Sequence, residues 1–228
     1  MVEINNDVVP VETIKQNLEK IYDKIDYACT NSNRNAKDIN LIVVTKNQSA
    51  QTLKNCIDCG LTNFGENRLN HLDEMISSLS SVTSTIPTWH FIGQLQSNKI
   101  SKIISNVSYI HSVSKKSHID LISDTQHPPK MFLQIYTGKN SNRAGAHIDD
   151  VPELINYSES KGNRFIGLMI MPDLDQDPYE QFSLAKVCAD KNSLEYLSMG
   201  MSGDFETAIA CGSTHIRLGS AIFQDDRK

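Results

Sequence analysis

The stretch LSMGMSGDFETAIACGSTHIRLGSAIF, residues Leu197–Phe223, decides the fold. An apolar run opens it, a segment of helical length follows, and a second apolar run comes near its end. Strand, helix and strand in this order predict parallel strands joined by a helical crossover. Glycine-containing turns, Met199–Gly203 and Gly219–Ala221, follow the two runs, and Arg217 stands inside the second run. Because arginine is costly to bury without a partner, we expect a partner for it inside the fold.

The same alternation continues through the rest of the chain. The strand-like runs are Leu41–Thr45, Thr62–Gly65, Thr88–Gly93, Ser108–Val113, Met131–Thr137, Arg164–Met171, Leu194–Met199 and His215–Leu218. The helical stretches between them are Ala50–Cys59, Glu66–Ser80, Gln94–Ser105, Lys115–Thr125, Asp150–Lys161, Pro178–Lys191 and Asp204–Cys211. A further helix is expected before the first strand, over Val11–Cys29, where apolar residues follow the helical period.

These elements predict an α/β protein with the (β/α)8 TIM-barrel fold and an extra N-terminal helix, in one domain over residues 1–228. An open doubly wound sheet is the alternative. Its usual phosphate fingerprint, GxGxxG after the first strand, is absent from this sequence. Gly60 and Gly212 stand where glycines end helices, and Pro178 follows Asp177 at a helix start.

Composition excludes several classes of protein. The formal net charge of −5 argues against a nucleic-acid binder, which should carry a basic face. No apolar run approaches the roughly 18 residues of a membrane helix, and the N-terminal stretch does not read as a secretory signal. Five cysteines without a disulfide-like spacing predict a reducing, cytoplasmic location. Cys56 and Cys59 form a CxxC, which favours two small apolar residues on one helix over a redox or metal site.

In a barrel, functional side chains lie at the carboxyl ends of the strands. Lys46 follows the first strand, where its amine either forms a Schiff base with a carbonyl or simply extends into solvent. The other strand ends bring further polar residues to the same rim: Glu66, Asn67, His90, Gln94, His111, Ser112, Arg143, Ser198, Ser202, Arg217 and Ser220.

The two glycine turns suit a phosphate. Backbone N–H groups in such turns, next to a helix N-terminus, bind phosphate, and Ser202 and Ser220 add hydroxyl donors. Loops after the last two barrel strands frequently have this role. The alternative is that Gly203 and Gly219 serve two ordinary turns that need small residues.

A lysine, a phosphate site and a polar group facing a ring together describe pyridoxal 5′-phosphate (PLP). Arg217 is always charged, so it can only donate a hydrogen bond to an unprotonated ring nitrogen. That arrangement makes PLP a poorer electron sink and argues against transamination. The alternative is a structural ion pair for Arg217, whose acidic partner the sequence does not identify.

Six motifs resemble one known family. They are VVTK (Val43–Lys46), FGENR (Phe64–Arg68), WHFIGQLQSNK (Trp89–Lys99), IGLMIMP (Ile166–Pro172), LSMGMSGDFETAI (Leu197–Ile209) and GSTHIRLGSAIF (Gly212–Phe223). In this order and spacing the chain resembles the PLP homeostasis protein family, small fold type III barrels related to the N-terminal domain of alanine racemase. The resemblance implies PLP as the cofactor, bound as a Schiff base to Lys46. It also implies Asn67 and His90 near the ring, Arg217 opposite the pyridine nitrogen, and a phosphate region made by Ser198, Met199, Ser202, Gly219 and Ser220.

The chain departs from the family pattern at a few positions. Thr45 replaces the usual serine before the lysine, and Arg143 stands where relatives tend to have lysine. Any role that needs a neutral amine at Arg143 is therefore in doubt. Ser220 replaces a frequent threonine and keeps the hydroxyl.

The resemblance implies intracellular PLP homeostasis by storage, buffering or delivery to PLP-dependent apo-enzymes, without catalytic residues or a metal. A weak amino-acid racemase is the alternative, and a barrel for another phosphorylated ligand is a third. Racemisation needs two bases, and in related racemases the second is a tyrosine from a separate β-domain, which we do not expect in a chain ending at Lys228. We expect a monomer, without nucleic-acid or membrane partners.

Overall fold

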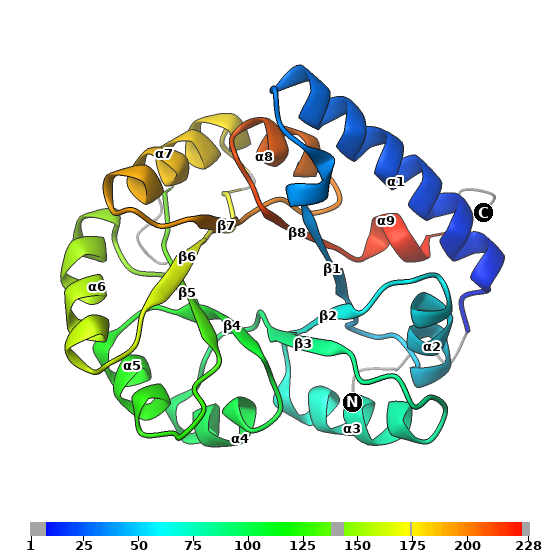
Figure 1. The fold of residues 1–228 in the computed structure, drawn as a ribbon, viewed down its shortest axis with the longest axis horizontal. Coiled ribbons are helices and arrows are strands. Elements are labelled where there is room, and N and C mark those ends of the chain that lie inside the picture. The colour runs from blue at the N-terminus through cyan, green and yellow to red at the C-terminus, as the bar shows by residue number, and fades with distance from the viewer. Residues whose placement is uncertain (1–7, 138–143, 174, 225–228) are drawn as a thin grey trace.

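Eight parallel strands close into a barrel in the computed structural model, which describes residues 8–137, 144–173 and 175–224 (Figure 1). The strands are β1 (Asn40–Val44), β2 (Asn63–Glu66), β3 (Thr88–Phe91), β4 (Tyr109–Val113), β5 (Lys130–Gln134), β6 (Phe165–Met169), β7 (Tyr196–Ser198) and β8 (His215–Leu218). They pair in chain order, and β8 pairs with β1. The closed order confirms the predicted barrel and excludes the open doubly wound sheet.

Helices surround the barrel in Figure 1. They are α1 (Val11–Asn31), α2 (Ala50–Asp58), α3 (Leu69–Ser80), α4 (Ile100–Ile104), α5 (Lys116–Ser123), α6 (Val151–Ser160), α7 (Pro178–Lys191), α8 (Phe205–Ala210) and α9 (Ser220–Phe223). Short 3-10 turns occur at Ala36–Asp38, Ser97–Lys99 and Ile148–Asp150. The expected helix signals are present: Asp177 caps α7, and Gly60 and Gly212 have positive φ after α2 and α8. Within the described ranges, no helix is long and apolar enough to cross a membrane.

Three helical segments differ clearly from the expectation. α3 begins at Leu69 instead of Glu66, because β2 continues to Glu66 and its carboxylate accepts the next two backbone N–H groups. The helix expected over Gln94–Ser105 contracts to a 3-10 turn and α4, since its first half has no apolar period. The four-residue α9 was not expected, because it is too short to show a period.

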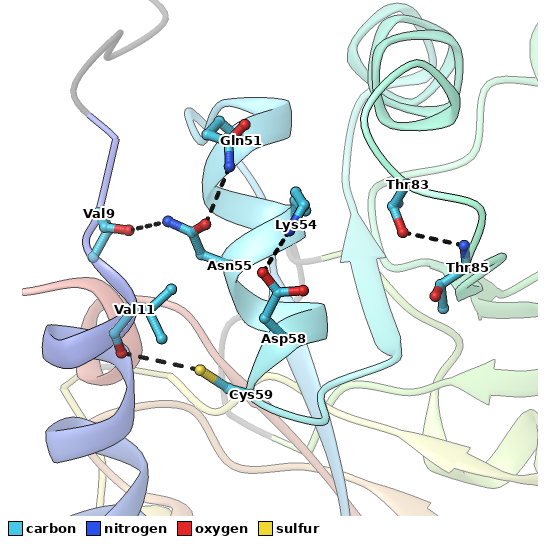
Figure 2. A network of polar contacts seen from close by, with 9 residues as sticks. All are labelled: Val9, Val11, Gln51, Lys54, Asn55, Asp58, Cys59, Thr83 and Thr85. Atoms are coloured by element: carbon cyan, nitrogen blue, oxygen red, sulfur yellow. Dashed lines mark hydrogen bonds and ion pairs between the residues drawn. The ribbon is translucent and has the colours of Figure 1, made fainter.

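Hydrogen bonds attach the N-terminal helix α1 and the residues before it to α2 and to the end of α9. Asn17 of α1 donates from Nδ2 to the carbonyl oxygens of Ile222 (2.9 Å) and Gln224 (2.8 Å), at the end of α9. Figure 2 shows the other attachment, where Asn55 of α2 donates to the carbonyl oxygen of Val9 at 2.9 Å. The start of α1 is thereby held against α2, and its middle against α9.

The CxxC cysteines lie in the same α1–α2 contact. Cys56 is fully buried, and burial raises the pKa of its thiol to about 12. The Cys59 thiol points toward the carbonyl oxygen of Val11, 4.0 Å away (Figure 2). Both are free thiols, and no group of metal-ligating side chains occurs in the part of the chain that the structure describes. The arrangement agrees with a packing role for both cysteines.

Candidate functional site

A cavity of about 670 Å³ opens at the carboxyl ends of β1, β2 and β3. Lys46, two residues beyond β1, lines it together with Asn47, Glu66, Asn67, Arg68, Leu69, Asn70, His71, Glu74, Phe91, Gln94, Gln96, Lys99 and Ile103. The Lys46 side chain is exposed, whereas Thr45 before it is fully buried. The strand therefore delivers the amine into an accessible cavity, where a ligand carbonyl can reach it.

Glu66 anchors the wall of this cavity. Its side chain is fully buried, and Oε2 accepts hydrogen bonds from Thr45 Oγ1 at 2.8 Å and from His71 Nδ1 at 2.6 Å. Oε1 accepts from the backbone N–H of Asn67 at 2.7 Å and more weakly from that of Arg68 at 3.3 Å. The threonine that replaces the family's serine thus keeps a hydroxyl in use beside Lys46.

The Glu66–His71 pair has shifted proton affinities. Burial alone would raise the pKa of Glu66, but the hydrogen bonds from His71 and Thr45 outweigh it and lower the pKa. The same hydrogen bond to Glu66 raises the pKa of His71, against the opposite effect of burial. His71 Nε2 is buried and has no hydrogen-bond partner among the described residues. The cavity that holds Lys46 therefore also holds an acid–base group.

Asn67 lies in the same cavity and is exposed. Its backbone packs directly against Gly93: a Cβ added to Gly93 would lie 2.1 Å from the Asn67 carbonyl oxygen. Only glycine allows this approach. The structure thus brings Lys46 and Asn67, two of the predicted site residues, to one cavity.

The second glycine turn lies beside the same rim. Val43 pairs with Leu218, so Gly219 is level with Val44, two residues before Lys46. Ser202 Oγ accepts the backbone N–H of Ala221 at 3.2 Å, which joins the turn after β7 to the start of α9. The N–H groups of Ile222 and Phe223 donate to the Gly219 carbonyl oxygen, which leaves the N–H of Ser220 as the donor that α9 can offer to an anion. Ser202 and Ser220 also line a small cavity of about 190 Å³ next to α1.

The remaining predicted residues lie inside the barrel. Arg217 is 3% exposed and donates from Nη1 to Ser198 Oγ at 2.6 Å and from Nη2 to the carbonyl oxygen of Ile170 at 2.9 Å. Burial lowers its pKa to about 10, which leaves it charged at neutral pH, and Asp204 opposes this shift from a distance. No ion pair to Arg217 occurs within the described parts of the chain. The structural ion pair considered for this arginine is absent there.

His90 is buried in the interior and is not among the residues that line the Lys46 cavity. Its ring contacts His111 at 3.0 Å and Asn63 at 3.2 Å and stacks on Tyr109 with the centroids 4.4 Å apart. Met199 is also fully buried, and its backbone bonds to that of β8 and to Ser213. The predicted site residues thus form three groups: the cavity, the turns and the interior. Arg143 lies outside the described residues.

Sequence reasoning noted His111 and Glu66 at strand ends but assigned them no role. His71 was missed altogether, although it follows Glu66 by five residues at the start of α3. A signal for His111 was available: alternation along a strand places every second residue of β4 in the interior. No comparable sequence signal pairs Glu66 with His71.

Comparisons with known proteins agree with the architecture. The chain is 31% identical over 223 residues to the pyridoxal phosphate homeostasis protein of Escherichia coli, covering 92% of this chain and 95% of that protein. The structure of PipY from Synechococcus elongatus with PLP bound matches with a TM-score of 0.71 and 26% identity, over 88% of this chain and 100% of that chain.

A more distant likeness concerns the fold alone. Alanine racemase from Corynebacterium glutamicum matches with a TM-score of 0.70 and 14% identity, over 96% of this chain and 63% of that chain. This confirms the expected alanine racemase-like barrel. No family model matches the chain.

Proposed function

The chain belongs to the pyridoxal phosphate homeostasis protein family, and from this premise we propose that it binds PLP and serves PLP homeostasis as a store or carrier. One observation carries the proposal: an exposed lysine, Lys46, stands in a cavity at the carboxyl end of a barrel strand. A relative with the same barrel has been solved with PLP bound.

The residues of this chain fit the cofactor by the chemistry of their donors. PLP, when bound, supplies an aldehyde that Lys46 holds as a Schiff base. The turns of Ser202 and Gly219–Ser220 would hold the phosphate, through the two serine hydroxyls and the backbone N–H of Ser220. Arg217, a buried cation with no carboxylate in contact among the described residues, would be the group that donates to the ring nitrogen.

Arg217 also supports a carrier over a catalyst. A guanidinium cannot accept a proton, so it cannot keep a ring nitrogen protonated as a carboxylate does. We therefore propose that the protein holds PLP with its electron-withdrawing capacity reduced, and delivers it to apo-enzymes. Asn67, exposed in the cavity, is assigned to the ring face.

Absorbance and chemical trapping test the proposal. Protein incubated with PLP should gain an absorbance in the violet region, and borohydride should fix the cofactor to the peptide that contains Lys46. Lys46→Ala should lose this adduct, whereas Lys99→Ala, a second lysine of the same cavity, should keep it. If Lys46→Ala retains the adduct, Lys46 is not the lysine that binds PLP.

One observation favours a second candidate, a weak amino-acid racemase. His71 lines the Lys46 cavity with a buried Nε2 atom that has no partner among the described residues, as an acid–base residue would. Exchange of the α-proton of L-amino acids in deuterated water decides between the two. Exchange at catalytic rates that is lost in His71→Gln would establish the racemase; its absence leaves the carrier.

A further inference from the structure

A chain of hydrogen bonds crosses the interior of the barrel from Arg217 to Asn63. Arg217 Nη1 lies 2.6 Å from Ser198 Oγ, which lies 2.8 Å from His111 Nδ1. His111 Nε2 lies 3.0 Å from His90 Nδ1, and His90 Nε2 lies 3.2 Å from Asn63 Oδ1. The five residues come from β8, β7, β4, β3 and β2, so the chain links strands on opposite sides of the barrel.

The two ends of the chain fix the direction of every proton in it. Arginine can only donate, so Ser198 Oγ accepts from Arg217 and directs its own hydrogen to His111 Nδ1. His111 therefore carries its proton on Nε2 and donates to His90 Nδ1. His90 in turn carries its proton on Nε2 and donates to the Asn63 carbonyl oxygen, which can only accept. Each member is satisfied when both imidazoles are neutral.

A proton added to either imidazole would break this order. Protonated His111 would turn a second donor toward Ser198 Oγ, which already accepts from a cation. The charged and titratable groups that act on the two rings are Arg217, His215 and each other, and none of them is a carboxylate. Burial is the main cause that lowers the pKa of His90, to about 3, and that of His111 well below its ordinary value.

Aromatic neighbours hold the two rings in place. His111 stacks on Phe132 with centroids 4.3 Å apart and planes 17° from parallel. His90 stacks on Tyr109 with centroids 4.4 Å apart and planes 9° from parallel. Packing and hydrogen bonds therefore both fix the orientation of each imidazole. The His111 ring in turn orients the Ser198 hydroxyl, which accepts from Arg217.

We propose that Ser198, His111 and His90 are positioning residues that fix the Arg217 guanidinium through a neutral, proton-ordered chain. Oriented dipoles, in place of a carboxylate counter-ion, then support the buried cation. The consequence for the cofactor rests on the proposed function: Arg217 meets the ring with its full charge and a single orientation. In this proposal Ser198 and His90 affect PLP binding through the position of the Arg217 side chain.

The chain is tested first in the protein without PLP. Long-range ¹H–¹⁵N spectra of histidine-labelled protein should show His90 and His111 with the proton on Nε2 and with no titration between pH 5 and 8. Ser198→Ala should shift the signals of both rings. The control is Ser158→Ala, an equally buried serine of α6 whose hydroxyl donates only to the Asn163 carbonyl oxygen. A proton on Nδ1 of either ring, or ordinary titration, overturns the proposal on the wild-type spectrum alone.

The second arm uses PLP itself. Ser198→Ala should bind PLP about tenfold more weakly, equivalent to about 1.4 kcal/mol, with a displaced absorbance maximum, whereas Ser158→Ala should match the wild type. Wild-type affinity and spectrum in Ser198→Ala would remove the positioning role. If the wild-type protein does not bind PLP at Lys46, the proposed function is wrong. The tautomers of His90 and His111 still test the hydrogen-bonded chain from Arg217 to Asn63 in that case.

Discussion

Replacing Glu66 by glutamine tests the electrostatics of the Lys46 cavity with a change of one atom. Glutamine keeps the volume of a fully buried side chain but replaces one acceptor oxygen by a donor. Two donors face each carboxylate oxygen, so the new NH₂ group must meet one of these pairs. The pair of Thr45 and His71 can adapt, because a hydroxyl and a neutral imidazole both accept.

The expected cost follows from the hydrogen bonds that change. A hydrogen bond to a charged group is worth roughly 1.5–3 kcal/mol and a neutral one roughly 0.5–1.5 kcal/mol. The 2.6 Å bond between His71 and Glu66 therefore weakens by about 1–2 kcal/mol when it becomes neutral. For a chain of 228 residues we expect the midpoint of thermal unfolding to fall by about 2–4 °C at pH 5.5.

The cost should depend on pH. The folded-state pKa of His71 is raised above its ordinary 6.5, so its contribution to stability is complete below that value and is lost as pH rises through the folded pKa. The pKa of Glu66 is lowered below its ordinary 4.5, so its contribution is complete above 4.5 and is lost as pH falls through the folded pKa. The pair is therefore worth most between about pH 4.5 and 6.5.

Urea unfolding of wild type and Glu66→Gln from pH 5 to 9, without PLP, measures this difference. The free-energy gap should be largest near pH 5.5 and should shrink above the folded pKa of His71, where the wild-type ring is neutral too. Glu74→Gln is the comparison: it is an exposed carboxylate of the same cavity that raises the pKa of His71 by its charge alone, so its gap should have the same sign and be smaller. A gap that stays constant over the whole range would refute the reasoning.

Other substitutions probe the packing around the site. Gly93→Ala places a Cβ 2.1 Å from a backbone oxygen and should cost about 3 kcal/mol in chemical unfolding, whereas Gly203→Ala meets no atom within 4 Å and should be nearly neutral. Asn17→Ala removes the donor of two carbonyl oxygens at the end of α9 and should lower the free energy of unfolding by about 2 kcal/mol in chemical unfolding. A titration of the same variant with PLP should show weaker binding. In the folded protein a thiol reagent should modify the partly exposed Cys59 before Cys56, whose thiol is fully buried with a pKa of about 12; peptide mapping that finds the reverse order contradicts the packing of α1 on α2.

Much of the fold was predictable because the strands are short, apolar and regularly spaced. Each crossover helix hides one face, and strands buried on both faces read as continuous apolar runs such as Leu41–Val44. The prediction failed where this signal is missing. Ser97–Lys99 is a short, exposed 3-10 turn without a periodic pattern, and α9 is joined to the turn after β7 by the bond between Ala221 and Ser202.

Of the predicted site residues, the structure brings Lys46 and Asn67 to one cavity, but the arrangement of the others was not predictable from the sequence. Lys46, Asn67 and Arg217 were predicted because each stands at the end of an apolar run. Such runs are visible in the sequence, and in a barrel their carboxyl ends carry the functional residues. Which interior side chains meet depends on the stagger between strands, which short runs do not reveal. Ser198 is level with His215, so Arg217 two residues later reaches across to Ser198 and Ile170.

The Glu66 network in the Lys46 cavity and the hydrogen-bonded residues behind Arg217 in the barrel interior differ in their response to protons, and we expect this difference to affect a bound ligand. Thr45, Glu66 and His71 form a network with a titrating histidine, whose pKa the hydrogen bond to Glu66 raises above the ordinary value. The chain behind Arg217 contains two histidines that stay neutral, so its electrostatics remain constant while His71 titrates. A ligand held between them meets a fixed cation on the side of β8 and a variable charge on the side of β2. The part of the pH dependence of PLP retention that His71 causes should therefore disappear in His71→Gln and persist in Ser198→Ala, because only the first variant removes this titrating group.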